Sequence, residues 1–500
     1  MDNGAKSTNT IMADGSSISA TNEQPAYTSS DIKEYSDALR REIHYLKQGK
    51  GKKYKIVNGN KLVKSDKGIY TYLFEMETEL HLPDDAPVVV EAAGGLRAVG
   101  SVLSCEDFQI LLLLDRDLND KVSSAYLMVE PWKLLEALDK KMNSLNPNIN
   151  KLAIKIMEEG PDLSTDTDIA NVPKGQPAVE HKLETDDIVT VWGPPGTGKT
   201  YTMAKIANSY IAQGKSVLIV SHSNVSVDGV IKQVVKMLGT DKQSILEDGK
   251  ILRFGYVRDD ELSQNPYATS FNYALSKCDS YARQLEHLMA KRDELRAKNQ
   301  MKSKEYDEVE HKIKEIRGEI RKEERKYVER AQVIGTTISR ATIDPIFEER
   351  QFDLVMFDEV SMAYVPQVIA AAALAKEKFM CVGDFRQLAP ISQSPDSRVL
   401  QVDIFSYLQI VDGKGNMYWH PWLVMLNEQR RMAPAISEFP SKFIYNRLLK
   451  DNAEVINGKK KRDNDLVIKS APLPGDALNL IDLAGTYLSL IHISEPTRHS

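Results

Sequence analysis

The chain has 500 residues, of which 42% are hydrophobic and 27% charged, an ordinary globular composition long enough for about three domains. Its formal net charge of −6 excludes a protein that binds nucleic acid through an overall basic excess, but it leaves binding through a local groove open. The longest apolar run, 368–375, is too short to span a membrane, and the first residues lack the layout of a secretion signal. Three widely spaced cysteines (Cys105, Cys278 and Cys381) show no zinc-ligand spacing, so we expect reduced thiols in the cytoplasm, or in the nucleus of a eukaryotic cell.

The first third of the chain predicts a disordered start and a small β-domain. Residues 1–30 are mostly small and polar and are expected to be disordered. Apolar residues then recur at helical spacing, which predicts an amphipathic helix. Short alternating strands separated by PDD and GG turns over 53–117 predict a small β-barrel. With a second helix at 131–142, residues 31–160 are expected to form stalk helices and a barrel, and a polar linker follows at about 160–175.

From residue 188 the pattern becomes α/β. The apolar segments IVTVW, SVLIV, FDLVMF and KFMCVG alternate with helical stretches, and polar residues follow each segment. This order predicts a doubly wound parallel sheet with ligands at the carboxyl ends of the strands. We assign 176–394 to a first α/β domain and 395–487 to the start of a second.

A charged insertion interrupts the first α/β domain at 271–332. Apolar residues at spacings of three, four and seven fall into two runs on either side of a polar break at about 298–304. The spacing predicts two antiparallel helices that form a coiled-coil hairpin. Two interpretations stay open, a solvated stalk or an arm that contacts nucleic acid or a protein partner.

A phosphate-binding loop is the most specific motif. The sequence GPPGTGKT fits the pattern GxxxxGK[ST], follows an apolar strand and precedes a helical stretch. In such a loop Lys199 neutralises the β- and γ-phosphates of ATP, and the Thr200 hydroxyl is a ligand of Mg²⁺. The loop residues are Gly193, Pro194, Pro195, Gly196, Thr197, Gly198, Lys199 and Thr200.

A carboxylate pair ends a later apolar strand. Asp358 and Glu359 follow FDLVMF, some 160 residues after the phosphate loop. Asp358 is expected to hold Mg²⁺, and Glu359 to orient or deprotonate the attacking water. The loop and the pair together predict an ATPase.

Four further blocks narrow the class. They are QPAV from Gln176, SHSNVSVD with Ser223 and Asn224, VIGTT with Thr336 and Thr337, and GDFRQLAP with Gln387. A last block, NEQRRM, contains Arg430 and Arg431. In this order, with the loop and the pair, residues 176–436 resemble superfamily 1 helicases of the nonsense-mediated-decay, senataxin and immunoglobulin-mu-binding type.

The resemblance implies a RecA-like motor that uses ATP and Mg²⁺ to move along single-stranded DNA or RNA, 5′ to 3′ in that group. No motif in this sequence distinguishes DNA from RNA. It implies that Gln176 reads adenine, that Gln387 senses the γ-phosphate, and that Arg431 reaches the γ-phosphate across a cleft. Arg430 replaces the family's usual tyrosine, and Arg431 is preferred by its spacing to Met432. The residues implied to contact the strand are Ser223, Asn224, Thr336 and Thr337.

Two other functions stay open. An AAA+ remodelling ATPase also uses GPPGTGKT, but it would have a helical lid where this chain has NEQRRM. A nucleotide-binding interaction module would use the hairpin as its working part. The stretch 488–498 resembles the translation of a sequencing-library adapter, so we expect 488–500 to be an artefact. The natural sequence is then expected to be interrupted near Tyr487, inside the second α/β domain. This chain is therefore expected to be a weak ATPase.

Overall fold

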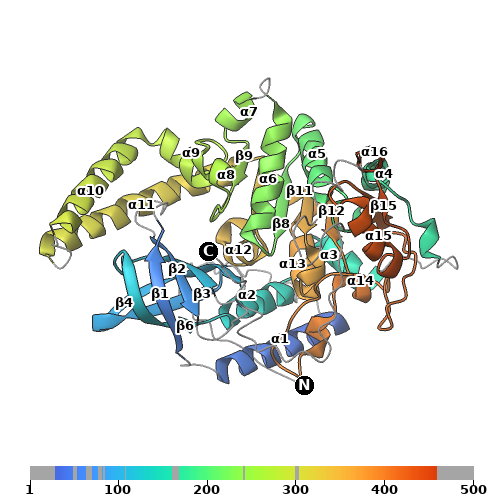
Figure 1. Ribbon diagram of the computed structural model, residues 1–500, viewed down its shortest axis with the longest axis horizontal. Helices are drawn as coiled ribbons and strands as arrows, with labels where there is room; N and C mark the ends of the chain where they lie inside the picture. The colour runs from blue at the N-terminus through green and yellow to red at the C-terminus, as the bar shows by residue number, and fades with distance from the viewer. Residues whose placement is uncertain are drawn as a thin grey trace, which may run out of the picture.

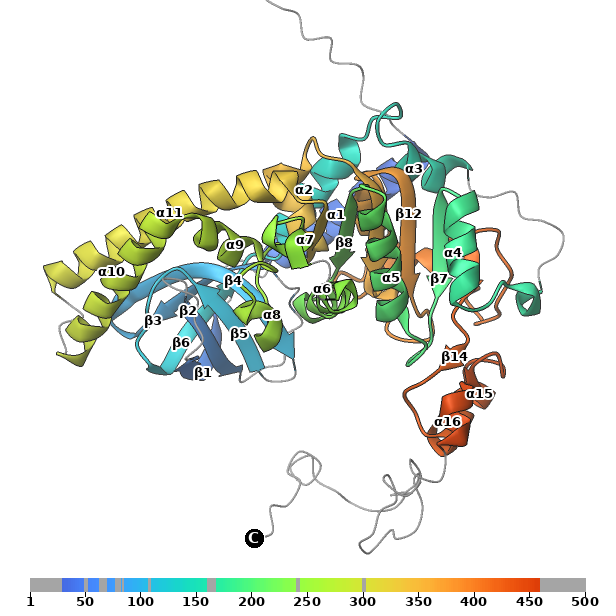
Figure 2. The ribbon, with the colours of Figure 1, turned by 90° about the horizontal axis from the view of Figure 1, so that it is seen from above.

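The computed structural model describes residues 29–48, 53–62, 70–76, 82, 85–106, 109–159, 168–239, 243–298 and 303–458. Three predictions lie wholly or partly outside the described residues: the disordered start (1–28), the polar linker (160–167) and the second α/β domain (459–487). The predicted artefact, 488–500, also lies outside them. The described part contains a barrel, a large parallel sheet covered by helices, and a small C-terminal segment (Figures 1 and 2). No helix in it is long and apolar enough to cross a membrane.

Six antiparallel strands close into the barrel in the order β1-β2-β5-β4-β3-β6. Alternate side chains of β2 fill its core, as the sequence predicts. The predicted strand region ends at residue 117, yet β6 closes the barrel by pairing with both β1 and β3. The consecutive serines Ser123 and Ser124 break its alternation, which hides this strand in the sequence. The strands are β1 Tyr54–Lys61, β2 Tyr70–Met76, β3 Pro87–Ala92, β4 Leu96–Glu106, β5 Gln109–Leu114 and β6 Lys121–Val129.

Two stalk helices, α1 (Ser30–Gln48) and α2 (Trp132–Asn143), flank the barrel in sequence and pack on each other. In α1 the buried face predicted from helical spacing joins the core of the α/β domain. The buried Glu42 carboxylate accepts hydrogen bonds from the backbone N–H groups of Gln393 (2.7 Å) and Ser394 (2.9 Å). The stalk is therefore fastened to the loop that follows GDFRQLAP.

The α/β domain is a seven-stranded parallel sheet in the order β13-β7-β12-β11-β8-β10-β9. Helices α4, α5 and α6 cover one face, and α12 and α13 cover the other with the stalk. Helices on both faces explain why the strands are continuous apolar runs. The strands are β7 Ile188–Trp192, β8 Val217–Ser221, β9 Ile251–Arg253, β10 Val333–Thr337, β11 Phe352–Asp358, β12 Ala375–Gly383 and β13 Leu423–Met425. The helices are α3 Lys151–Ile154, α4 Gln176–Thr185, α5 Lys199–Ala212, α6 Asn224–Leu238, α7 Gln243–Glu247, α8 Asp260–Gln264, α12 Ile338–Ile343, α13 Val365–Ala372 and α14 Ile404–Tyr407.

The boundary predicted between residues 394 and 395 differs from the structure. Strand β13 pairs with β7 and forms one edge of the first sheet, so the chain leaves that sheet only after Leu426. Three residues are too few to show periodicity, which is why the strand is missed. Beyond it, β14 (Glu428–Gln429) pairs with β15 (Lys450–Asp451), and α15 (Pro434–Phe443) and α16 (Ala453–Asn457) accompany them.

The insertion forms two long helices, α10 (Asp279–Ala297) and α11 (Lys304–Arg330), which follow the short α9 (Ser270–Lys277). They run side by side above the barrel (Figures 1 and 2). The buried Arg292 donates to the Tyr70 hydroxyl of the barrel (3.2 Å). The predicted seam residues Leu285, Leu295, Tyr306, Val309, Ile313 and Ile320 form one buried cluster. A hairpin of two helices thus rests on the barrel, and its coiled-coil geometry stays a prediction.

Candidate nucleotide site at the strand ends

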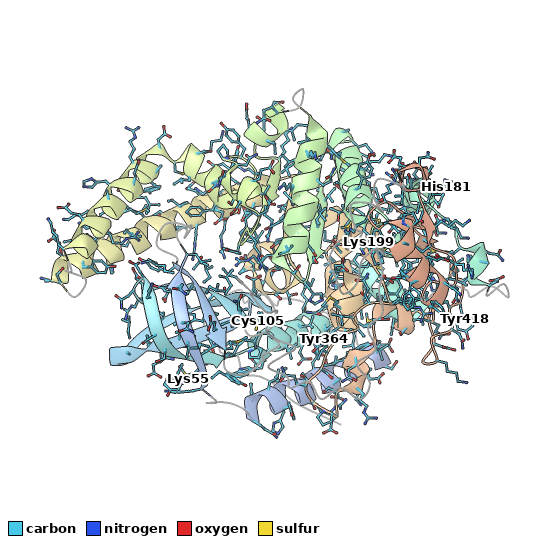
Figure 3. The ribbon with its side chains drawn as sticks, in the orientation of Figure 1. Lys55, Cys105, His181, Lys199, Tyr364 and Tyr418 are labelled. Carbon is cyan, nitrogen blue, oxygen red and sulfur yellow. The ribbon has the colours of Figure 1, made fainter. Side chains whose placement is uncertain are left out.

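The phosphate loop joins the end of β7 to the start of α5. Gly196 and Gly198 have φ values of 76° and 86°, a left-handed conformation that favours glycine and lets backbone N–H groups face an anion. The Lys199 ammonium lies 3.0 Å from the Gly193 carbonyl oxygen and 3.6 Å from the Glu359 carboxylate. Figure 3 shows Lys199 at this end of the sheet. The motif therefore has the backbone form that its sequence predicts.

The carboxylate pair stands at the end of β11, beside this loop. Asp358 is buried, and its Oδ1 has no hydrogen-bond partner in the described part of the chain. Burial, and to a lesser extent the Glu359 charge, raise the pKa of Asp358 to about 7, although the Lys199 charge opposes the shift. Glu359 has a φ of 53°, a conformation that costs energy in a non-glycine residue and often occurs at functional sites.

These groups fit a magnesium ion held together with a nucleotide. Among the described residues no cluster of three His, Cys, Asp or Glu side chains could bind a metal by itself. Mg²⁺ characteristically uses one or two protein oxygens and completes its shell with water and phosphate oxygens. A buried carboxylate oxygen that lacks a partner, beside a phosphate loop, provides such a ligand, and the Thr200 hydroxyl is the second candidate.

The GDFRQLAP segment is tied to the phosphate loop through its first residue. The Gly383 carbonyl oxygen accepts from the Gly193 N–H (2.8 Å). The next residue, Asp384, is fully buried and accepts from the Gln387 side-chain amide (2.8 Å). The structure therefore brings the predicted sensor Gln387 to the same strand-end edge as Lys199 and Asp358.

The NEQRRM segment lies directly against the phosphate loop. The Arg430 N–H donates to the Gly196 carbonyl oxygen (2.9 Å), and a Cβ built on Gly196 would stand 2.7 Å from the Arg431 Cβ. The Arg430 guanidinium is 3.7 Å from the Glu454 carboxylate, away from the loop. Both arginines are exposed. The structure thus places the side chains of Arg430 and Arg431 in different surroundings, whereas the sequence distinguishes them only by their spacing to Met432.

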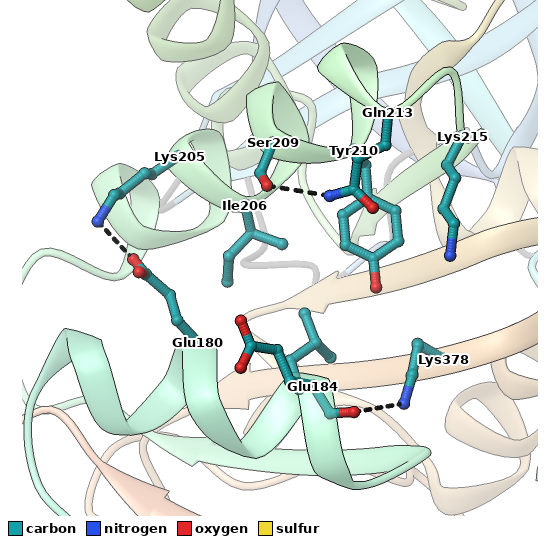
Figure 4. A pocket seen from close by; sticks show the side chains of 10 residues that line it. Glu180, Glu184, Lys205, Ile206, Ser209, Tyr210, Gln213, Lys215 and Lys378 are labelled. Carbon is teal, nitrogen blue, oxygen red and sulfur yellow. Dashed lines mark hydrogen bonds and ion pairs between the residues drawn. The ribbon is translucent and has the colours of Figure 1, made fainter.

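Gln176 begins α4, and its amide donates to Glu180 on the same helix (3.0 Å). No hydrogen bond joins Gln176 to the phosphate loop in the part of the chain that the structure describes. Farther along α4, residues from Glu180 onward line a pocket of about 340 Å³ together with helix α5. The Glu180 and Lys205 side chains form an ion pair there (2.6 Å; Figure 4). Its lining contains no phosphate-loop residue, so this pocket is separate from the nucleotide site.

The four residues expected to contact a strand lie at neighbouring strand ends, but in different surroundings. Ser223 caps α6 by accepting from the Ser226 N–H (3.1 Å). Asn224 is buried between Arg253, which donates to its oxygen (2.7 Å), and the Leu103 carbonyl oxygen of the barrel. Their positions agree with a shared edge, and Asn224 is engaged within the protein.

The two threonines of VIGTT also differ from each other. The buried Thr336 hydroxyl has no partner in the described residues, whereas the Thr337 hydroxyl donates to Asp85 of the barrel. Asp85 also lies 3.4 Å from the Arg340 guanidinium. The barrel therefore contacts the region of both predicted strand-binding motifs, through Leu103 and Asp85.

Sequence reasoning misses three of these residues. Arg253 is fully buried and bonds Asp228 (2.6 Å), so it fixes the start of α6, and no motif marks it. Asp85 stands in a turn with a φ of 65°, where the only signal is the PDD turn itself. Tyr445 donates to Asp384 (2.7 Å) from the C-terminal segment. Only tertiary contact identifies such residues.

Comparison with known proteins shows to which families and relatives the chain is similar. Two family models, each described as an AAA domain, match residues 174–395 and 416–485, together more than half of the chain. DNA polymerase alpha-associated DNA helicase A of Saccharomyces cerevisiae is 26% identical over 296 residues, covering 54% of this chain and 40% of that protein. DNA-binding protein SMUBP-2 of Mesocricetus auratus is 26% identical, covering 55% and 27%. The regulator of nonsense transcripts 1 homolog of Arabidopsis thaliana is 26% identical, covering 54% and 20%.

The chain therefore has two matches to AAA domains, and over them it is similar to superfamily 1 helicases of the nonsense-mediated-decay, senataxin and immunoglobulin-mu-binding type. It spans less than half of the length of each of these three relatives.

Proposed function

We propose that the protein is an ATP-dependent nucleic-acid helicase that hydrolyses ATP to move along a single strand, 5′ to 3′. The observation that carries the proposal is the meeting of two parts of the chain at the phosphate loop. The loop, the carboxylate pair and Gln387 come from one sheet, and Arg431 comes from the segment beyond it. An ATP site completed from two parts can convert hydrolysis into relative movement.

Each group has a chemical task in this proposal. Lys199 and the loop N–H groups bind the phosphates, and Asp358 with Thr200 holds Mg²⁺, which offsets charge on the phosphate oxygens. Glu359 accepts the proton of the attacking water. Arg431 stabilises the charge that develops on the transferred phosphoryl group. The parallel strand order, with β12 between β7 and β11, supports a RecA-like core for this chemistry.

The strand is proposed to lie across the ends of β8 and β10. Ser223 and Thr336 provide polar groups there, and backbone N–H groups at the starts of α6 and α12 suit phosphate oxygens, whose contacts position a strand without reading its sequence. The relatives named above include a DNA helicase, a DNA-binding protein and a regulator of nonsense transcripts. Either DNA or RNA therefore remains a substrate in this proposal, since no described contact selects a 2′-hydroxyl.

ATP hydrolysis with and without single-stranded nucleic acid tests the proposal. Turnover is measured alone, with oligo(dT) and with oligo(U), for the natural sequence and for Lys199→Ala. We expect one or both strands to stimulate hydrolysis, and Lys199→Ala to abolish it because the phosphates lose their cation. Nucleotide binding without stimulation by either strand would instead support an interaction module in which the nucleotide is a switch.

A further inference from the structure

Asp384 is a buried charge on which several parts of the nucleotide site converge. It directly follows β12, it is 0% exposed, and none of the ion pairs in the described residues includes it. Its Oδ1 accepts from the Trp192 indole N–H (3.1 Å) and from the Arg386 backbone N–H (3.1 Å). A buried carboxylate without a cation depends on such hydrogen bonds, which are stronger than those between neutral groups.

The other oxygen of Asp384 serves two side chains from different parts of the molecule. Oδ2 accepts from the Gln387 amide (2.8 Å) and from the Tyr445 hydroxyl (2.7 Å). Gln387 belongs to the loop that follows β12, whereas Tyr445 lies two residues beyond the end of α15, in the segment that contains Arg431. One carboxylate oxygen therefore connects the γ-phosphate sensor of the proposed function with the segment that carries its arginine.

Tyr445 is held for this contact. It is 3% exposed, and its ring lies 6.1 Å from the ring of Trp192, the last residue of β7 before the phosphate loop. Burial, together with the Asp384 charge, raises the pKa of Tyr445 well above its ordinary value, so the hydroxyl keeps its proton and remains a donor. The contact is thus packed on one side and charge-assisted on the other.

We propose that Tyr445 is a positioning residue that sets the Gln387 amide through Asp384, and so couples the sensor to movement of the C-terminal segment. The inference rests on the proposed function. When the segment moves relative to the sheet, the hydroxyl leaves or rejoins Oδ2. The carboxylate then rotates toward its remaining donors, and the Gln387 amide moves with it.

A double-variant cycle tests the coupling. Tyr445→Phe keeps the ring and removes only the hydroxyl, and it is compared with Gln387→Ala and with the combination of both. We expect Tyr445→Phe to lower kcat for nucleic-acid-stimulated hydrolysis roughly tenfold, with KM for ATP within about twofold, since hydrogen bonds to charged groups have about this effect. The double variant should equal Gln387→Ala alone, because Tyr445 acts through Gln387.

A matched control removes the same kind of contact elsewhere. The Tyr407 hydroxyl donates to Asp31 of the stalk (2.5 Å), so Tyr407→Phe deletes another tyrosine–aspartate bond, one that includes neither Asp384 nor Gln387. We expect this variant to keep the natural kcat. Equal losses in both tyrosine variants would show a structural effect and overturn the proposal.

A second readout needs neither hydrolysis nor a strand. The affinity for a non-hydrolysable ATP analogue is divided by the affinity for ADP, and this ratio should fall in Tyr445→Phe to the value of Gln387→Ala. Independent, additive effects of the two substitutions on kcat and on this ratio would overturn the inference alone. A natural sequence that binds no ATP would contradict the proposed function, and the inference with it.

Discussion

Arg430 and Arg431 are adjacent, yet the structure gives them different surroundings. Arg431 stands with its Cβ next to Gly196 of the phosphate loop, while the Arg430 guanidinium lies near Glu454 within its own segment. The Arg430 backbone also meets Gly196, but its guanidinium lies near Glu454, whereas the Arg431 side chain starts against the loop. The choice made by spacing to Met432 is therefore also the choice that the packing favours.

Substituting the two arginines separately gives the first prediction. Arg431→Ala should lower kcat for ATP hydrolysis by roughly 10³- to 10⁵-fold with little change in ATP affinity, because the arginine acts on transition-state charge. Arg430→Ala removes an exposed ion pair and should change kcat by less than about threefold. Steady-state kinetics with direct nucleotide binding measures both, and the reverse ranking would contradict the assignment.

Asp358 gives a prediction on protons. Since burial raises its pKa to about 7, near pH 7 about half of the molecules carry a proton on this carboxyl before Mg²⁺ and nucleotide bind. The bound cation favours the charged form, so binding should release about half a proton at pH 7 and almost none above about pH 8.5.

Titration calorimetry in buffers with different ionisation heats measures this release. Asp358→Asn has no titrating group at this position and should remove the pH-dependent part of the signal. The same proton release in Asp358→Asn would show that another group is responsible.

At the scale of elements, the barrel meets the strand ends through the Leu103 carbonyl oxygen and the Asp85 carboxylate. The Asp85 carboxylate accepts a hydrogen bond from the Thr337 hydroxyl and lies 3.4 Å from the Arg340 guanidinium. A hydroxyl and a guanidinium are also groups that bind a nucleic-acid phosphate. Thr337 and Arg340 cannot bind the Asp85 carboxylate and a phosphate at the same time. The described position of the barrel should therefore compete with a bound strand.

Asp85→Asn tests this competition. Removing the charge weakens the barrel contact, and we expect affinity for single-stranded nucleic acid to rise about tenfold, as for the loss of one charge-assisted hydrogen bond. Glu91→Gln is the matched control, because it removes the same charge from β3, where the carboxylate pairs with Lys53 of the barrel. Fluorescence anisotropy measures both. Equal gains in the two variants would indicate a general charge effect and contradict the contact.

The same elements show what the sequence can and cannot predict. The phosphate loop, the strand before it and the buried faces of β2 and α1 follow from local patterns, since each depends on residues a few positions apart. The Thr337–Asp85 contact joins residues 252 positions apart, and Tyr445 meets Asp384 from the C-terminal segment. Tyr445 itself lies beyond the NEQRRM block of that segment and no motif marks it. Such pairs depend on how the elements pack, so neither periodicity nor spacing reveals them.

At the scale of the whole molecule, contacts join the nucleotide site to regions on both sides of it. The Asp384 contacts connect it to the C-terminal segment, and Glu42 fastens the stalk to the loop that follows Gln387. The stalk is continuous in sequence with the barrel, which contacts the strand ends through Asp85. These contacts provide a physical route by which the bound nucleotide can change the affinity for a nucleic-acid strand, as the proposed function requires.

Directional movement along a strand tests the central claim most directly. Streptavidin is bound to biotin at the 3′ or the 5′ end of a single-stranded oligonucleotide, and its ATP-dependent displacement is followed with the natural sequence and with Lys199→Ala. The account predicts displacement from the 3′ end by the natural sequence only, because a motor that moves 5′ to 3′ arrives there. Stimulated ATP hydrolysis without displacement from either end would contradict a motor and leave a nucleotide switch.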